Sequence, residues 1–261
     1  MQIAFLKYQG AGNDFIMIDN RTGNFSSMTT DQIAFLCNRN KGVGADGLIL
    51  IQGSEKADFK MVYYNADGRE STLCGNGGRC SVAFAANLGI IDTKTCFEAI
   101  DGLHHAEVLP DKLVRLEMAS VSELKTQDNA LVIDTGSPHY VTLRDSVQDL
   151  NTTEEGAAIR YSPAFQSEGI NVNFIARTET NALEIRTYER GVENETLACG
   201  TGAVASALAA DYWNLLGGEN PIKLYALGGI LQVAFEKTPQ GYENITLLGP
   251  AEFVFSGTIE I

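Results

Sequence analysis

The chain alternates between short apolar stretches and glycine-containing turns, a pattern that predicts many short strands. Residues 3–8 and 15–19 alternate or run apolar on either side of the turn at 10–14, which favours two strands joined by that turn. Residues 47–52 form a continuous Leu/Ile run, which is typical of a buried strand. Residues 59–65 predict one more strand, because they are apolar and aromatic and end at an Ala-Asp-Gly turn.

The second half of the chain repeats this order of elements. Residues 183–188 alternate apolar and polar side chains and predict a strand. In each half a strand that ends near a tyrosine, Tyr64 or Tyr188, is followed 10 and 11 residues later by a cysteine and then by a helix, expected over 82–88 and 203–215. An internal duplication into two α/β domains is one interpretation, and chance similarity between two glycine- and alanine-rich helices is the other.

One further helix is predicted over residues 29–37, where Thr29 or Thr30 is placed to cap its N-terminus. If the chain is duplicated, the boundary between the halves falls near residues 116–125, where the chain becomes polar and irregular. The last strand, over residues 251–261, could close the second domain or return to the first.

Composition narrows the class of partner. The 261 residues suffice for a buried core and permit one large domain or two smaller ones, and 44% hydrophobic with 20% charged residues is ordinary for a globular enzyme. Nineteen Lys and Arg against 33 Asp and Glu give a formal net charge of −14, which disfavours nucleic acid and anionic membrane surfaces. No stretch reaches the roughly 18 apolar residues of a spanning helix. The N-terminus lacks the features of a signal peptide, so a cytoplasmic location is expected.

The five cysteines stand at positions 37, 74, 80, 96 and 199, without paired C-x-x-C spacing. A structural zinc site and a disulfide framework are therefore not expected. Three histidines, two of them adjacent, form no recognisable ligand set, so no metal is predicted. Cys37, Cys80 and Cys96 are interpreted as packing residues.

Cys74 and Cys199 differ from the others, because each precedes a Gly-x-Gly segment and a run of small and apolar residues. The N-terminal N–H groups of a helix stabilise negative charge, so a cysteine there is favoured as a thiolate. Glycine lets those N–H groups approach a ligand closely, and two such helix starts could bind one carboxylate. We therefore predict that one thiolate removes a proton from the adjacent α-carbon while the other cysteine, as a thiol, delivers a proton from the opposite face. The result is inversion of configuration.

Other interpretations of these two segments stay open. A single cysteine before Gly-x-Gly is often only a buried small residue, and it is the matched pair that favours catalysis. Gly-x-Gly also occurs in nucleotide-binding loops, but neither segment fits the dinucleotide fingerprint or the P-loop. A protein that binds an amino acid without transforming it would keep the carboxylate-binding helix starts and would need no reactive thiols.

Several blocks of the chain resemble the diaminopimelate epimerase family. They are, in order, Gly10-Ala11-Gly12-Asn13-Asp14-Phe15, Gly42-Val43-Gly44-Ala45-Asp46-Gly47, Asn65-Ala66-Asp67-Gly68, Cys74-Gly75-Asn76-Gly77-Gly78-Arg79-Cys80, Tyr188-Glu189-Arg190-Gly191 and Glu195-Thr196-Leu197-Ala198-Cys199-Gly200-Thr201-Gly202. The match runs almost end to end, and several blocks in the same order are more specific than any one of them. The resemblance implies an isomerase that works without pyridoxal phosphate or another cofactor. It would convert LL-diaminopimelate to meso-diaminopimelate in lysine and peptidoglycan precursor biosynthesis.

The resemblance also implies the architecture. The expected fold is α/β (α+β), with two pseudo-symmetric domains that each wrap a curved mixed sheet around a central helix, and with the active site in the cleft. Because the C-terminal strand of the family returns to the first domain, that domain is expected to comprise residues 1–117 and 250–261, with Cys74. The second domain would comprise residues 118–249, with Cys199. A small-molecule substrate and a homodimer are implied in the same way.

The resemblance further assigns roles around the two cysteines, which become the two catalytic bases. Backbone N–H groups hold the reacting α-carboxylate, and polar side chains recognise the other charged groups of the substrate. The first set is Gly75, Asn76, Gly200 and Thr201, the second is Asn13, Asn65, Asn171, Glu189 and Arg190, and Ser137 and His139 are possible additions. Such a set suits a substrate with an ammonium and a carboxylate at each end, since Arg pairs with carboxylates, Glu binds ammonium and Asn does both.

Some of these assignments compete with simpler interpretations. Asn13 and Asn65 lie in glycine-containing turns, where asparagine often serves only the backbone geometry. Glu189 and Arg190 could form a solvated pair at a strand end. His139 taken alone is more often a structural histidine.

The chain also departs from the family pattern. Family members commonly carry Asn where this chain has Ser137, and some carry Gln where it has Gly47, which leaves open how the distal end of the substrate is recognised. The main alternative enzyme is a proline or hydroxyproline racemase or epimerase of the same fold. That family typically has a histidine where Asn76 stands.

Overall fold

The computed structural model describes residues 2–71, 73–179, 181–218 and 220–261. The chain divides into two compact units, of which unit 1 comprises Met1–Leu116 with Gly249–Ile261 and unit 2 comprises Glu117–Leu248. Within the described ranges, each helix is too short or too polar to cross a membrane.

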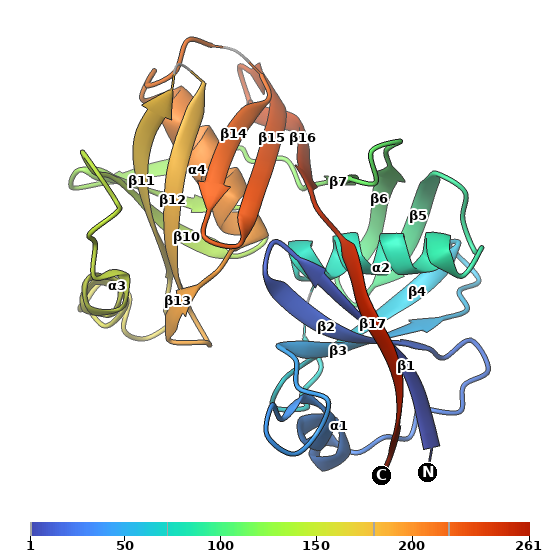
Figure 1. Ribbon diagram of the computed structural model, residues 1–261. Coiled ribbons are helices and arrows are strands. Elements are labelled where there is room, and N and C mark those ends of the chain that lie inside the picture. The colour runs from blue at the N-terminus through green and yellow to red at the C-terminus, as the bar shows by residue number, and fades with distance from the viewer. Residues whose placement is uncertain (1, 72, 180, 219) are drawn as a thin grey trace. The chain divides into compact units, whose positions relative to one another are not determined.

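Unit 1 is built on a curved mixed sheet that contains both ends of the chain. Its strands lie in the order β17 (Glu252–Glu260), β1 (Gln2–Gly10), β2 (Asn13–Asp19), β3 (Gly47–Gln52), β4 (Phe59–Asn65), β5 (Lys94–Ala99), β6 (Gly102–Val108) and β7 (Val114–Glu117). Successive neighbours pair antiparallel, antiparallel, parallel, antiparallel, parallel, antiparallel and antiparallel. The C-terminal strand β17 therefore runs beside the N-terminal strand β1 (Figure 1).

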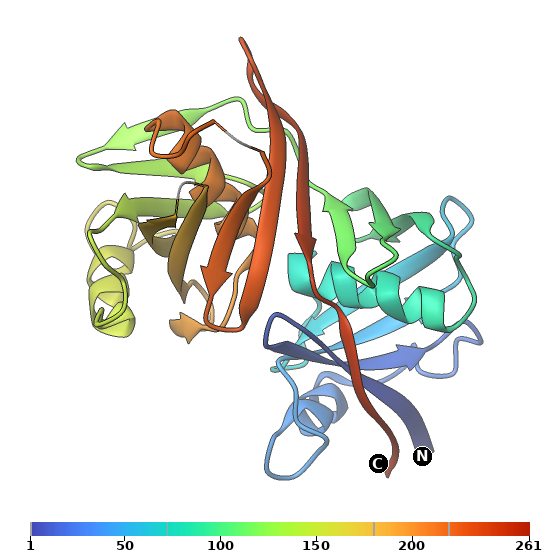
Figure 2. The same ribbon diagram turned by 45° about the horizontal axis from the view of Figure 1, so that its top comes forward.

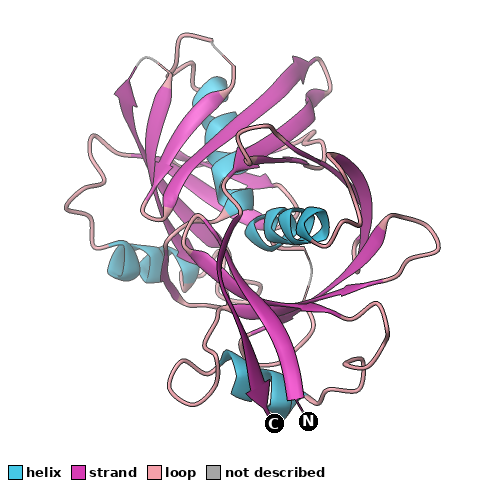
Figure 3. Ribbon diagram, turned by 45° about the vertical axis from the view of Figure 1, so that its right-hand side comes forward, coloured by secondary structure: helices cyan, strands magenta, loops and turns pink. Residues whose placement is uncertain are grey.

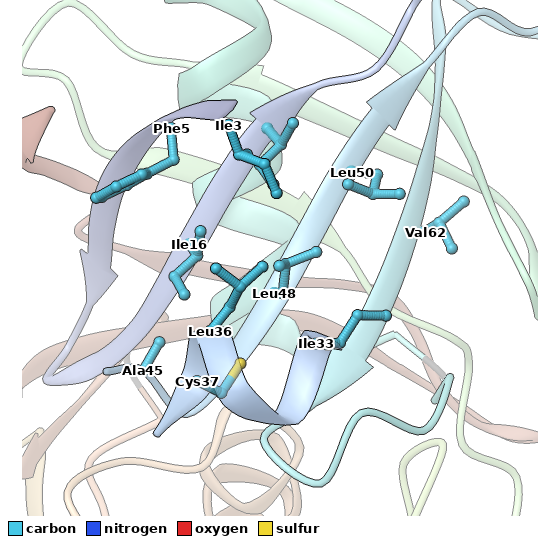
Figure 4. Packing of buried hydrophobic residues seen from close by; sticks show 11 residues of the cluster. Ile3, Phe5, Ile16, Ile33, Leu36, Cys37, Ala45, Leu48, Leu50 and Val62 are labelled. Atoms are coloured by element: carbon cyan, nitrogen blue, oxygen red, sulfur yellow. The ribbon is translucent and has the colours of Figure 1, made fainter. Parts of the chain in front are cut away.

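Two helices cover the two faces of this sheet. The strands curve around α2 (Gly75–Asn87), which Figure 3 shows nearly end-on. The outer face packs on α1 (Thr30–Cys37), which begins at the capping residue Thr29 and directs Ile33, Leu36 and Cys37 at the strands (Figure 4). Alternate residues of each strand face opposite sides, so one strand supplies both layers of the core.

Unit 2 repeats this arrangement. Its strands lie in the order β8 (Leu124–Gln127), β9 (Ala130–Asp134), β10 (Pro138–Leu143), β11 (Asn171–Glu179), β12 (Ala182–Glu189), β14 (Ile222–Ala226), β15 (Gly229–Thr238) and β16 (Gly241–Gly249). The short β13 (Asn194–Thr196) pairs with the end of β12, and the helices are α3 (Thr152–Arg160) and α4 (Gly200–Tyr212). The sequence of antiparallel and parallel pairings is the same as in unit 1, and α4 packs against several strands of the sheet as α2 does in unit 1 (Figure 2).

The register of the strands relates the two units residue by residue. Leu48 pairs with Tyr64 across β3 and β4, and Val172 pairs with Tyr188 at the corresponding place across β11 and β12. The α/β fold with two pseudo-symmetric halves, each a mixed sheet around a central helix, is thereby confirmed.

The predicted strands over 47–52 and 59–65 are confirmed, and so is the helix over 29–37, with Thr29 as its cap. The expected starts of the two central helices were wrong. Helix α2 begins at Gly75 rather than at residue 82, and α4 spans Gly200–Tyr212 rather than 203–215. Glycine has a low intrinsic helix propensity, but close packing requires it here: a Cβ at Gly202 would lie 2.4 Å from the side chain of Asn173.

The region near the boundary between the halves was also expected to be irregular. Instead, Leu124–Gln127 forms β8, which pairs antiparallel with β9. The sequence does not reveal this strand because its residues are polar or only half-buried, with Lys125 and Thr126 exposed.

Candidate active site

Cys74 lies at the N-terminus of α2 in unit 1. Its backbone is extended (φ −94°, ψ 125°), and its carbonyl oxygen accepts the first helical bond from the N–H of Gly78, at 2.7 Å. Cys74 is therefore the N-cap residue, directly before the first-turn N–H groups that have no acceptor within their own helix, and its side chain makes no capping hydrogen bond. The predicted location of this cysteine at a helix start is confirmed.

Asparagine side chains surround the Cys74 sulfur. Asn13 Oδ1 lies 3.6 Å from Cys74 Sγ and accepts a hydrogen bond from Asn76 Nδ2 at 3.3 Å. Asn76 is held in turn by Arg79, whose guanidinium is fully buried and donates to Asn76 Oδ1 at 2.9 Å. Asn13 thus presents an acceptor to Cys74, which suits the protonated thiol.

A charged cluster orients Asn13. The carboxylate of Asp46 accepts from Asn13 Nδ2 at 2.6 Å, and Arg39 bridges Asp46 to Asp14 with two contacts of 2.7 Å. Lys7, which is 5% exposed, pairs with Asp14 at 2.7 Å. Burial by itself would raise the pKa of Asp14, but the hydrogen bonds and charges of Arg39 and Lys7 outweigh it and lower that pKa to about 2.

Asn65 and Gly47 meet at the end of this sheet, where they pair across β3 and β4. Asn65 is exposed at the end of β4, and its N–H and C=O groups close the turn through Arg69 and Gly68. A Cβ at Gly47 would lie 2.6 Å from the carbonyl oxygen of Tyr64, so a larger residue requires this strand pair to shift. Close packing against Tyr64 therefore explains why this chain has Gly47 where some members of the family carry Gln.

Cys199 occupies the same position in unit 2. Its backbone is extended (φ −121°, ψ 118°), and its carbonyl accepts from the N–H of Ala203 at 2.9 Å, which starts α4. The Sγ atom lies 3.4 Å from Thr201 Oγ1. Either atom can be the donor in this contact, so the hydroxyl can donate to a thiolate or accept from a thiol.

His139 connects Thr201 to the core of unit 2. His139 Nε2 lies 2.9 Å from Thr201 Oγ1, and His139 Nδ1 lies 2.9 Å from Asn173 Nδ2. Burial, with a smaller contribution from the charge of Arg190, lowers the pKa of His139 to about 3. The imidazole is therefore neutral at physiological pH and carries one N–H.

The remaining polar residues predicted in unit 2 form a second cluster. Asn171 Nδ2 donates to Ser137 Oγ at 2.9 Å, and Asn171 Oδ1 accepts the backbone N–H of Arg190 at 2.9 Å. The guanidinium of Arg190 donates to the carbonyl of Glu168 at 3.0 Å and approaches Ser137 Oγ at 3.5 Å. Within the described part of the chain it has no carboxylate partner, so it can take an anionic group of a ligand.

The structure therefore gathers the predicted residues into two clusters, one in each unit. Unit 1 brings together Cys74, Gly75, Asn76 and Asn13, and leaves Asn65 in an exposed turn. Unit 2 brings together Cys199, Gly200, Thr201, His139, Ser137, Asn171 and Arg190, with the half-buried Glu189 at the end of β12. Among the described residues, no group of three or more His, Cys, Asp and Glu side chains could hold a metal ion.

The other cysteines have structural positions. Burial raises the pKa of Cys37 and of Cys80 to about 12, so neither thiol ionises near neutral pH. Cys96 is half-buried in β5.

Among the residues of these clusters that the sequence did not predict are Asp46, Arg79 and Asn173. Asp46 and Arg79 lie inside blocks that carry the resemblance, but their side chains were given no role. Asn173 lies two residues after Asn171, and this spacing on a strand places both side chains on one face, which was an available signal.

Comparison with known proteins identifies close relatives of the whole chain. The sequence profile of the family described as diaminopimelate epimerase matches residues 5–122 and 131–254. The diaminopimelate epimerase of Flavobacterium psychrophilum is 51% identical over 253 residues, which cover 97% of this chain and 98% of the relative. That of Chlorobaculum tepidum is 44% identical over 259 residues, which cover 97% and 99%.

Solved structures with low sequence identity share the fold. A Bacillus anthracis phenazine biosynthesis protein of the PhzF family superimposes with a TM-score of 0.77 at 14% identity, covering both chains completely. A hydroxyproline epimerase from Agrobacterium vitis gives a TM-score of 0.69 at 14% identity, covering 99% of this chain and 91% of the other. At this identity the likeness shows the fold alone.

Proposed function

Because this chain belongs to the diaminopimelate epimerase family, we propose that it converts LL-diaminopimelate to meso-diaminopimelate by proton transfer between two cysteines, without a cofactor. The observation that carries the proposal is the repetition of one arrangement: Cys74 and Cys199 each begin a buried, glycine-containing helix at the same place in two units of identical topology. A packing role for two cysteines does not require this match.

The α-carboxylate would be held by the N–H groups at the two helix starts. Gly75 and Gly200 are buried and lack a Cβ, which leaves room for a ligand oxygen near Asn76 and Thr201. Both helix dipoles favour the negative charge, and they also favour the carbanion that forms when the α-proton leaves.

We assign Cys199 as the base and Cys74 as the acid in the resting enzyme. The hydroxyl of Thr201 can donate to a Cys199 thiolate, whereas Asn13 Oδ1 can only accept and therefore favours the Cys74 thiol. The Cys199 thiolate takes the α-proton of the L-centre, and the Cys74 thiol gives its proton to the opposite face of the carbanion. Cys74 is then the thiolate and Cys199 the thiol, and exchange of one proton with water restores the starting state.

The distal end of the substrate would be recognised by the cluster around Arg190. Its guanidinium suits the distal carboxylate, and Glu189 and the asparagines Asn65 and Asn171 suit the distal ammonium and carboxylate. Ser137, which contacts Asn171 directly, would act by orienting that amide.

One assay separates the three candidate functions. Incubation of LL-diaminopimelate in D2O is expected to give meso-diaminopimelate with deuterium at the inverted α-carbon. Activity confined to proline or hydroxyproline would support the racemase alternative. Binding of diaminopimelate without exchange would leave a binding protein and would exclude catalysis.

We also propose a homodimer in the cytoplasm. The support for a dimer is an apolar stretch on β17, where Phe253, Val254 and Phe255 are each about half exposed. Light scattering after size-exclusion chromatography should show a dimer that Val254→Glu dissociates and that Thr258→Glu, on the same strand, leaves intact. A monomeric parent protein would exclude the dimer.

The proposed location follows from the chemistry, because two reactive thiols require a reducing compartment.

A further inference from the structure

A line of buried polar side chains leads away from Cys199 into the sheet of unit 2. Thr201 contacts His139 at 2.9 Å, His139 contacts Asn173 at 2.9 Å, and Asn173 Oδ1 accepts from Thr187 Oγ1 at 2.9 Å. His139 and Asn173 are 0% exposed and Thr187 is 3% exposed. The three lie on the adjacent strands β10, β11 and β12, and Asn173 pairs directly with Thr187.

The fold itself does not need these polar residues. In unit 1 the strand register places Phe15, Ile49 and Tyr63 where unit 2 has His139, Asn173 and Thr187. The central helices confirm the correspondence, because a Cβ at Gly77 would contact Ile49 at 3.2 Å, and one at Gly202, also three residues after its cysteine, would meet Asn173. The same architecture therefore forms over an apolar floor, by which we mean the side chains of Phe15, Ile49 and Tyr63 beneath the central helix. Burying polar side chains at these positions costs desolvation free energy, and the topology of unit 2 does not require it.

The direction of the hydrogen bonds follows from this line. Thr187 donates to Asn173 Oδ1, so the amide turns its Nδ2 donor toward His139 Nδ1. A neutral imidazole that accepts at Nδ1 carries its hydrogen on Nε2 and donates it to Thr201 Oγ1. The hydroxyl hydrogen of Thr201 is then left to point at Cys199 Sγ.

We propose that Asn173, oriented by Thr187, is a positioning residue that fixes the tautomer of His139 and thereby keeps the Thr201 hydroxyl aimed as a donor at the Cys199 sulfur. This proposal deepens the proposed function, because it explains how the base is held ready. The reverse direction, with Nδ1–H donating to Asn173 Oδ1, would turn the Thr201 hydroxyl toward His139 and leave Cys199 as the donor. The amide orientation selects between a thiolate-stabilising and a thiol-stabilising line.

Neither Asn173 nor Thr187 carries a charge, and the charged group that acts on His139 is Arg190. Replacing Asn173 or Thr187 by an apolar residue of similar shape therefore removes a hydrogen bond of the line without removing a charge. This separates a positioning effect from a general electrostatic one.

Two measurements on the unliganded full chain test the proposal. The first is ¹⁵N NMR of the histidine side chains, which distinguishes the Nε2–H from the Nδ1–H tautomer, and only three histidines contribute signals. The second is the rate of Cys199 alkylation by iodoacetamide against pH, followed by peptide mass spectrometry. The variants are Asn173→Leu and Thr187→Val, and the matched control is Thr142→Val, a buried threonine of β10 that accepts from Arg144 instead.

The parent protein is expected to show neutral Nε2–H His139. Asn173→Leu should lose this tautomer preference and move the alkylation midpoint of Cys199 upward by about one pH unit, the size of a lost hydrogen bond to a charged group. Thr187→Val should cause a smaller shift in the same direction, and Thr142→Val should cause none. If Asn173→Leu does not fold, Thr187→Val carries the test.

A parent protein with Nδ1–H or charged His139 would overturn the proposal, and so would variants with unchanged tautomer and alkylation profile. Both measurements need no substrate. A parent protein that fails to epimerise LL-diaminopimelate therefore counts against the proposed function alone, while the NMR and alkylation results decide the role of Asn173.

Discussion

Each unit has a cysteine at the start of its central helix, but the side chains of the sheet beneath the two helices differ. Beneath α2, Phe15, Ile49 and Tyr63 form an apolar layer in which the rings of Phe15 and Tyr63 pack edge to face at 5.9 Å. Beneath α4, the corresponding residues His139 and Asn173, with Thr187, form a hydrogen-bonded line. The two units therefore share one topology, and in the proposed mechanism the side chains at equivalent positions distinguish the acid from the base.

The side chains that contact the two cysteines also differ between the units. Asn13, which faces Cys74, is anchored by the charged cluster of Asp46, Asp14 and Arg39. The neighbour of Cys199 is a hydroxyl held by a neutral histidine. Cys74 thus has a hydrogen-bond acceptor as its neighbour, whereas Cys199 has a hydroxyl that can donate. This is the asymmetry that the proposed thiol and thiolate require.

Removal of either sulfur should have the largest effect. Cys74→Ala and Cys199→Ala are each expected to lower kcat for epimerisation by about 10³-fold or more, because each removes one proton-transfer group. Circular dichroism and thermal unfolding should match the parent protein, since both cysteines are only half-buried. A single variant with near-normal turnover would contradict the two-base mechanism.

The charged cluster of unit 1 should appear in the pH dependence of stability. The pKa of Asp14 falls from an ordinary 3.8 to about 2 in the folded state. The stabilisation is therefore full above about pH 4 and is lost as the pH falls through about 2, and a shift of this size corresponds to about 2 kcal/mol. Urea unfolding of Asp14→Asn should show this deficit near pH 6 and little deficit near pH 2. A constant difference across that range would exclude the ion-pair explanation.

The donor at Cys199 can be removed without changing side-chain shape. Thr201→Val should slow Cys199 alkylation about 10-fold below its midpoint, since one hydrogen bond to a thiolate is lost. Thr201→Ser keeps a hydroxyl and should restore the rate. Cys74 should react more slowly than Cys199 in the parent protein, and faster reaction of Cys74 would reverse the assignment of acid and base.

The smallest effect is expected from the apolar floor of unit 1. Ile49→Val should lower the free energy of unfolding by about 1 kcal/mol, because it removes one buried methylene group. It should leave the alkylation profile of Cys74 unchanged, in contrast to Thr187→Val beneath Cys199. A changed Cys74 profile would show that both floors tune their cysteines.

The sequence predicted the elements that have a strong local signal. The apolar run at 47–52 and the capping threonine Thr29 define their elements without tertiary contacts, so these predictions are correct. The starts of α2 and α4 could not be predicted in this way, because the glycines that weaken a helix locally are those that let it pack closely. Strand β8 could not be predicted either, because it has no apolar periodicity. It forms through its pairing with β9, which is a tertiary contact.

The two cysteine–glycine segments could be found from the sequence alone, because a helix start with Gly-x-Gly has a chemical meaning wherever it lies. Their surroundings could not. Asn13 reaches Cys74 across 61 residues of sequence, and His139 reaches Thr201 across 62. Which side chain donates and which accepts depends on partners that only the paired strands bring within hydrogen-bond distance. The sequence therefore determined that there are two similar thiols, and the tertiary structure decided how their surroundings differ.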